Sequence, residues 1–351
     1  MAQSLTAEVL EQPEVAASPR RLTLRGTTSF EWLFVILGGL PFYLPLLFLM
    51  GERGLSAQNP IYWYFWINAA ISSPHVWSTY ARLSRKIGEK KISWWFGFPL
   101  YLAICGVLVL ASKAGYFVEA LTAVNLWQTF HYSRQVFGVS KLMSRNRNDD
   151  DTVRKLSFYG FHLAVPLFVL GRWDVLYTVW GGRASASIIP VRVAPVIMSV
   201  CWALAALGVV AGLAAELRSY RRAERDYNPA RLVTFIVYFA VQTFGFLSVT
   251  FFQRGFFAVT IFHAVQYLAI VWLMEKKAGT GRTVTVLSRV PAAAAFPVFW
   301  AALFGAGYLI ENYVFPGANR LWPLMAAVGL AAISAHHYSV DTVMWRRKVG
   351  A

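Results

Sequence analysis

The chain has 351 residues, of which 57% are hydrophobic and only 14% are charged. Soluble domains are about 45–50% apolar and about 25% charged, so the composition excludes an ordinary soluble fold and indicates an all-α polytopic integral membrane protein. The formal net charge of +16 is explained by basic loops that face anionic lipid, and we expect no nucleic-acid partner.

Ten stretches are long and apolar enough to cross about 30 Å of hydrocarbon, which takes about 20 helical residues. In chain order they are 30–50, 60–81, 94–112, 116–138, 156–173, 193–215, 232–252, 256–274, 291–309 and 321–344. We therefore predict a single ten-helix transmembrane domain over residues 30–347. Residues 1–29 form a polar N-terminal tail that lacks the pattern of a cleaved signal peptide.

The basic residues predict the orientation of this helix bundle. When residues at the end of a span are counted with the adjoining segment, alternate segments hold 26 of the 33 Lys and Arg residues and the others hold 7. Such a bias follows the positive-inside rule and supports the count of ten spans. We expect both termini to be cytoplasmic and the protein to reside in a bacterial inner membrane.

Several predicted spans carry a polar stripe on one helix face. In the second span, Asn68, Ser72, His75 and Thr79 are spaced by 4, 3 and 4 residues. Comparable groups occur in the fourth and eighth spans, and they consist of Gln128, His131, Tyr132 and Gln135 and of His263, Gln266 and Tyr267. Such stripes cannot face lipid, so they are expected to meet inside the bundle.

The last span contains the adjacent histidines His336 and His337, followed by Asp341. His337 and Asp341 stand at positions i and i+4 and share a helix face, whereas His336 points about 100° away. The fifth span carries one further histidine, His162. Ionisable side chains at membrane depth are rare and are functional-site candidates by default.

All six histidines are predicted at or below mid-membrane on the cytoplasmic side, given their distances in sequence from the cytoplasmic basic residues. Neutral imidazole is the commonest metal ligand in proteins and suits iron, copper and zinc. We predict a metal centre with the ligands His75, His131, His263, His336 and His337. Asp341, Tyr267 and Tyr132 are the candidate catalytic residues, and the supporting or additional ligands are His162, Gln135, Gln266, Asn68 and Gln128.

A polytopic membrane protein with histidines gathered at the cytoplasmic side resembles, in overall plan, the membrane di-iron desaturases, hydroxylases and oxygenases. Those families carry HxxxH and HxxHH boxes, whereas this chain has only the His336-His337 pair and spreads its other histidines over separate spans. The resemblance implies iron, as one or two ions, together with molecular oxygen, an electron donor and a hydrophobic or lipid-like substrate.

Other interpretations use the same residues. Two histidines on facing helices can ligate haem, and three histidines with an aspartate can form an open zinc site of a lipid hydrolase. A proton or metal transporter could use the histidines as a relay. His162 is equally suited to an interhelical hydrogen bond, and His131 to a contact with lipid headgroups near Arg134.

Overall fold

The computed structural model describes residues 24–49, 73–144, 149–175, 194–223, 227–247, 249–278, 292–309 and 323–344. This part of the chain is helical and contains no strand, which confirms the all-α prediction for these residues.

Almost all of the described residues lie in helices. Two are irregular, the π-helix η1 (Glu31–Ile36) and the 3-10 helix η3 (Trp94–Phe96). The α-helices are α1 (Leu40–Leu49), α4 (Ser73–Gly88), α5 (Phe98–Lys113), α6 (Phe117–Met143), α7 (Asp151–Gly171), α10 (Ala194–Ala223), α11 (Pro229–Gly245), α12 (Val249–Ala278), α14 (Ala292–Leu309) and α16 (Pro323–Met344).

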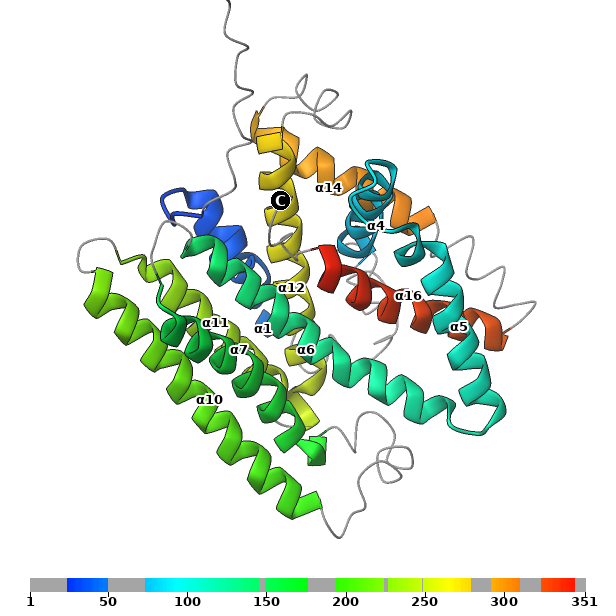
Figure 1. The fold of residues 1–351 in the computed structure, drawn as a ribbon, viewed down its shortest axis with the longest axis horizontal. Coiled ribbons are helices and arrows are strands. Elements are labelled where there is room, and N and C mark those ends of the chain that lie inside the picture. Colours follow the sequence, from blue (N-terminus) through cyan, green and yellow to red (C-terminus); the bar gives the residue numbers. More distant parts are fainter. Residues whose placement is uncertain are drawn as a thin grey trace, which may run out of the picture.

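Helix α12 runs through the middle of the molecule (Figure 1). Helices α7, α10 and α11 lie on one side of it, and α4, α5, α14 and α16 lie on the other, while α6 contacts members of both groups. Helix α16 packs against α4, α5 and α6, and α12 packs against α4 and α11. The polar faces of α4, α6, α12 and α16 can therefore meet inside the bundle.

Three described helices are long and apolar enough to cross a membrane, namely Asp151–Gly171, Ala194–Arg222 and Ala258–Lys276. The ten predicted spans are not confirmed. Helix α5 has 16 residues and α11 has 17, and the predicted span 232–252 is interrupted because α11 ends at Gly245 and α12 begins at Val249. Polar side chains on α6 and α16 lower the hydropathy of those helices.

The predicted first span is also interrupted, between η1 and α1. Gly38 and Gly39 have φ angles of 54° and 76°, in the left-handed region that glycine adopts without strain. A Cβ on Gly38 would lie 2.3 Å from Phe262 of α12, so only glycine allows this close approach. This turn allows η1 to pack against α12.

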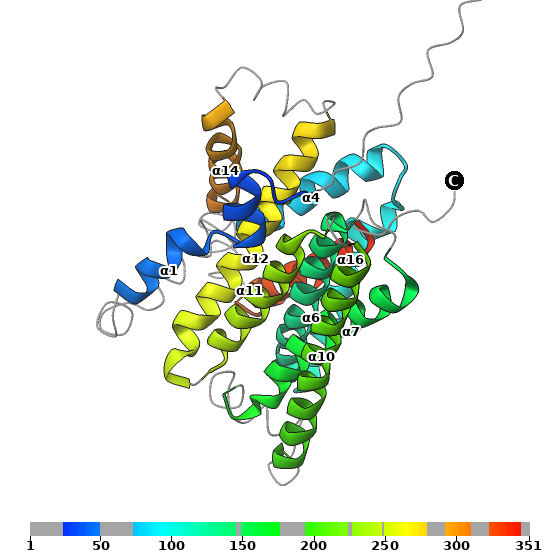
Figure 2. The ribbon, with the colours of Figure 1, turned by 90° about the vertical axis from the view of Figure 1, so that its left-hand side faces the viewer.

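Helices α7 and α10 approach each other closely and run side by side (Figure 2). The contact is made by small residues, because a Cβ on Gly208 would lie 2.5 Å from the backbone nitrogen of Ala164 and a Cβ on Gly160 would lie 2.6 Å from Cα of Gly212. Small residues four positions apart on both helices are typical of helix pairs in membranes.

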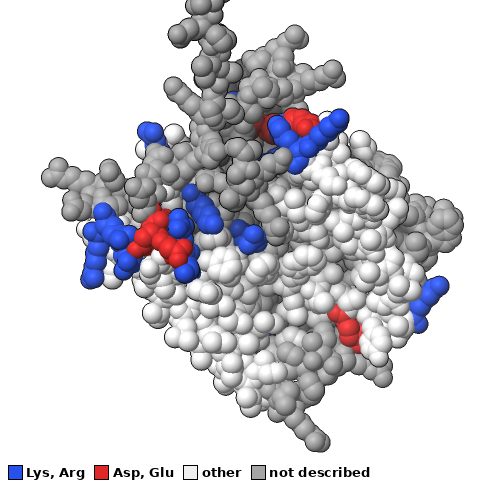
Figure 3. Space-filling view, viewed as in Figure 1, with Lys and Arg blue, Asp and Glu red and all other residues white. Residues whose placement is uncertain are grey.

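A buried ion-pair network joins the ends of α7, α10 and α11. The Arg231 guanidinium donates to Glu216 at 2.6 Å and to Asp149 at 2.8 Å, and both Arg231 and Glu216 are buried. Nearby, Arg218 donates to Asp150 at 2.7 Å and holds the pKa of that carboxyl below its ordinary value. In Figure 3 most of the described surface is uncharged, and its charged side chains lie mainly in the upper half of the view.

Candidate metal centre

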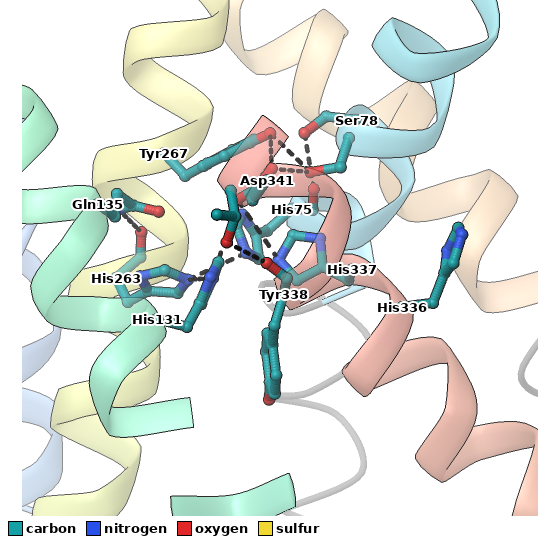
Figure 4. Close-up of polar contacts among 12 residues, drawn as sticks. His75, Ser78, His131, Gln135, His263, Tyr267, His336, His337, Tyr338 and Asp341 are labelled. Atoms are coloured by element: carbon teal, nitrogen blue, oxygen red, sulfur yellow. Dashed lines mark hydrogen bonds and ion pairs between the residues drawn. The ribbon is translucent and has the colours of Figure 1, made fainter. Parts of the chain in front are cut away.

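Four helices each contribute one buried histidine to a compact group, hereafter the four-histidine group. Its members are His75 on α4, His131 on α6, His263 on α12 and His337 on α16. One ring nitrogen of each lies within 4.8 Å of the others. Figure 4 shows the four rings directed toward one another.

The nitrogens are spaced as ligands of one ion would be. Nε2 of His263 lies 3.1 Å from Nε2 of His75 and 3.2 Å from Nε2 of His131. Two imidazoles that bind one ion at about 2.1 Å place their nitrogens at most about 4.2 Å apart. The widest separation in the group, up to 4.8 Å, exceeds this limit by about 0.6 Å, so an inward shift of that order or somewhat more would bring all four nitrogens within ligand distance.

Several nitrogens of the group have no hydrogen-bond partner within the described part of the chain. They are Nδ1 of His75, Nδ1 of His263 and both ring nitrogens of His337, and all are buried. A buried polar atom without a hydrogen bond costs about 1–3 kcal/mol. A bound cation would satisfy Nε2 of His337, so the residues present fit a metal ion.

Asp341 lies beside the group on α16. Its Oδ2 is 3.8 Å from Nε2 of His131 and 3.8 Å from Nε2 of His337. Its Oδ1 accepts hydrogen bonds from the hydroxyls of Tyr267 at 3.0 Å and Thr79 at 3.3 Å, and those two hydroxyls are 2.6 Å apart. The carboxylate is therefore held from one side with its other oxygen toward two histidines (Figure 4).

Gln135 and Gln266, which were predicted to support the centre, donate hydrogen bonds to backbone carbonyls and do not contact the histidine ring nitrogens. Gln135 donates to the carbonyl of His263 at 3.0 Å and to Oε1 of Gln266 at 3.2 Å. Gln266 in turn donates to the carbonyl of Val35 at 2.7 Å. This chain ties α6, α12 and η1 together next to the four-histidine group.

Tyr132 supports the centre through its ring. Its centroid lies 4.0 Å from that of His263, with the planes tilted by 34°. Its hydroxyl accepts a hydrogen bond from Gln128, one turn earlier on α6. The described contacts thus give Tyr132 and Gln128 a packing role, and they place the hydroxyl of Tyr267 closer to the carboxylate of the site.

Two predicted histidines lie outside the four-histidine group. Nε2 of His336 donates to the carbonyls of Phe96 and Gly97 at 2.9 and 3.1 Å, and its ring points away from the group (Figure 4). Adjacent residues on a helix diverge by about 100°, so α16 directs His337 inward and His336 toward α5. His162 stacks on Phe158 of the same helix and donates to its carbonyl at 2.8 Å, so its described hydrogen bond is made within α7 and not between helices, and it takes no part in the four-histidine group.

The sequence-based site list also contained Asn68, which lies outside the described residues. It omitted Thr79 and Tyr338. Thr79 is fully buried and one turn beyond His75 on the polar stripe of α4, and that spacing could have indicated it. The ring of Tyr338 packs 4.6 Å from His131, a contact that depends on tertiary packing.

A small cleft reaches the centre from one side. Its lining includes the buried residues His131 and Asp341, and its other lining residues come from α6, α12 and α16, namely Arg134, Gln135, Gly138, Val139, Ile270 and Thr342. Its volume of about 20 Å³ is close to that needed by one water molecule.

No protein-family model, no curated protein and no solved structure matches this chain. The class of protein therefore follows from the geometry alone. The described part of the chain is helical, and three of its helices are long and apolar enough to cross a membrane. Four buried histidines could hold a transition metal.

Proposed function

We propose that the protein is a membrane-embedded, metal-dependent oxidoreductase that acts on a lipid-like or other hydrophobic substrate. The observation that carries the proposal is the four-histidine group, in which buried ring nitrogens from four helices lie within 4.8 Å of one another. A purely structural role does not explain why Nε2 of His337 is buried in this group without a hydrogen bond among the described residues.

Iron is the metal we propose, because imidazole with a nearby carboxylate is the ligand type of non-haem iron oxygenases. When bound, the ion would supply the redox chemistry with molecular oxygen, and an electron donor would have to restore its oxidation state. The compact group suits one ion, because the described residues place His336 and His162 elsewhere.

The protein's own residues orient and shield the proposed ion. Asp341 stands 3.8 Å from two of the imidazoles, close enough to act as an orienting group or, after a small shift, as a further ligand. Tyr267 and Thr79 hold its second oxygen. The tight packing of α4, α6, α12 and α16 keeps bulk water away, and the small cleft lined by His131 and Asp341 offers a path for oxygen.

The membrane topology predicted from sequence belongs to the same proposal. We propose one ten-span domain over residues 30–347 that follows an N-terminal tail at 1–29, with both termini cytoplasmic, in a bacterial inner membrane. Three apolar helices support membrane insertion. The regular alternation of basic residues supports the orientation.

A zinc-dependent hydrolase is the second candidate, because histidines with a carboxylate also form open zinc sites. Haem is disfavoured. His263 places its Nε2 3.1–3.2 Å from those of His75 and His131, which leaves no space for a planar macrocycle among these rings. A transporter would need polar paths toward both membrane faces, and the polar stripes of the sequence lie on one half only.

Metal analysis of the detergent-purified protein tests the proposal. After expression in metal-replete cells we expect about one bound ion per chain, with iron separating the oxidoreductase from the zinc hydrolase. A protein that holds no transition metal would end both.

A further inference from the structure

A second cavity lies between α4, α5 and α16, on the other side of α16 from the metal centre. It has a volume of about 440 Å³, within the range of sites for small hydrophobic ligands. Its wall includes Trp77, Tyr80, Phe98, Tyr101, Ile333 and His336. We name it the aromatic cavity.

The described wall of the aromatic cavity has no charged residue and few polar groups that are free to bind a ligand. None of its described lining residues is charged. The His336 nitrogens are occupied by the carbonyls of Phe96 and Gly97 and by the hydroxyl of Tyr80 at 3.1 Å. An occupant is therefore expected to bind through hydrocarbon and not through hydrogen bonds.

The cavity borders a face that suits lipid. Phe98, in its wall, is 69% exposed, and the same helix continues with exposed Leu102, Val107 and Leu110. A hydrophobic molecule could thus enter sideways from the bilayer. This apolar face also explains why α5 carries no polar stripe.

The end of the cavity at Ile87 is followed in the chain by basic residues that could bind an anionic head group. Ile87 lines the cavity, and the segment that follows contains Lys90 and Lys91, both exposed. Glu89 is the one acidic residue of this segment, and it pairs with Lys91 at 2.7 Å. Basic residues at a membrane surface attract anionic lipid.

We propose that the aromatic cavity binds the hydrocarbon chain of an anionic lipid whose head group lies at Lys90 and Lys91. The cavity and the metal centre share their walls, since Tyr80 follows Thr79 on α4 and His336 precedes His337 on α16. That this lipid is the substrate class of the enzyme rests on the proposed function; that it binds here does not.

Photolabelling of the full-length protein in neutral detergent tests the site. The probe is a diazirine analogue of palmitic acid, and labelled peptides are mapped by mass spectrometry. We expect labelling of the segments that contain Tyr80 and Ile333. Ile333→Trp should lower it roughly tenfold because the new ring overfills the cavity, whereas Leu102→Trp on the exposed face of α5 should leave it unchanged.

Two further arms define the ligand. A fatty-alcohol probe of the same length should label more weakly than the acid, and Lys90→Gln with Lys91→Gln should remove that difference. A photoreactive phosphatidylglycerol that labels the cavity better than the fatty acid would identify a phospholipid as the source. Ile87→Trp narrows the opposite end of the cavity and serves as the second variant if Ile333→Trp does not fold.

The outcomes separate this inference from the proposed function. Labelling spread along exposed α5 and equal in wild type and Ile333→Trp or Ile87→Trp would overturn the lipid site, even in a metal-loaded protein. Labelling confined to the cavity in a protein without bound metal would uphold the lipid site while ending the oxidoreductase proposal. Lost labelling with retained metal in Ile333→Trp supports the inference.

Discussion

His75 and His263 face each other across the contact of α4 and α12, with their Nε2 atoms 3.1 Å apart. Neutral imidazole carries one donor and one acceptor, so a short contact between two nitrogens needs a proton or a cation between them. His131 lies 3.2 Å from the same nitrogen of His263. Nε2 of His263 would have to serve both neighbours with one lone pair or one proton, and a metal ion removes that conflict.

The adjacent histidines of α16 give the sharpest test of the ligand set. His337→Ala should abolish metal binding, because it removes one of four converging nitrogens. His336→Ala should keep the metal, because that ring contacts Phe96 and Tyr80 instead of the four-histidine group. Elemental analysis of both purified variants measures this, and equal metal content in wild type and His337→Ala would contradict the assignment.

Asp341→Asn should weaken metal affinity by about 10–100-fold, the usual effect of losing a group that orients a ligand. Asparagine has the same shape, but its uncharged side chain no longer attracts an ion or polarises His131 and His337. Competition with a chelator of known affinity provides the measurement. The melting temperature of the metal-free variant should remain near that of wild type, and undiminished affinity would remove Asp341 from the centre.

Tyr267→Phe deletes the hydroxyl that donates to Asp341 while keeping the ring against His75. We expect a loss of metal affinity smaller than that of Asp341→Asn, since the carboxylate stays but loses one of its two described donors. Tyr238→Phe is the matched control, because its buried hydroxyl bonds Ser133 and not the carboxylate. Equal effects of the two changes in the chelator assay would show that only general stability is involved.

Gly208→Ala should destabilise the α7–α10 pair by about 1–3 kcal/mol through overpacking. The new Cβ would lie 2.5 Å from the backbone of Ala164, which cannot move away without shifting α7. Gly106→Ala on α5 meets open space and should be neutral or stabilising by about 0.5–1 kcal/mol. Thermal unfolding in detergent compares them, and a Gly208→Ala protein as stable as Gly106→Ala would refute the close packing.

Glu216→Ala should cost about 3–5 kcal/mol of unfolding free energy, because it leaves the buried Arg231 guanidinium with fewer partners. Replacing both residues, as Glu216→Leu with Arg231→Met, should recover part of that loss, since no buried guanidinium then lacks a partner, while Asp149 loses its 2.8 Å contact with Arg231. Thermal unfolding of the single and double variants provides the comparison. A single variant with wild-type stability would show that the network contributes little.

The helical period and the depth of each histidine predicted which rings would converge. His337 and Asp341 share a face, and the polar stripes of the other helices led to His75, His131 and His263. The fate of His336 could not be predicted, because its partner depends on which neighbour packs beside α16. The polar stripe of the second span includes Thr79, but a role for its hydroxyl follows only from the approach of Tyr267, whose hydroxyl lies 2.6 Å away.

The boundaries of the individual spans were less accessible from the sequence. Residues 232–252 form one continuous apolar run in the sequence. In the structure α11 ends at Gly245, α12 begins at Val249, and the two helices pack against each other. The break at Gly38 and Gly39 likewise depends on the contact with Phe262, which lies more than 200 residues away. Tertiary contacts of this kind leave little trace in local composition.

The spread of the four-histidine group along the chain governs when the centre can form. The chain is synthesised from its N-terminus, so His337 and Asp341 arrive with the last helix, after α4, α6 and α12 have already been made. An ion captured before that moment would meet an incomplete set of ligands. Docking of α16 is therefore the step that closes the centre, and a chain truncated before it could insert most of its helices yet never retain the proposed metal.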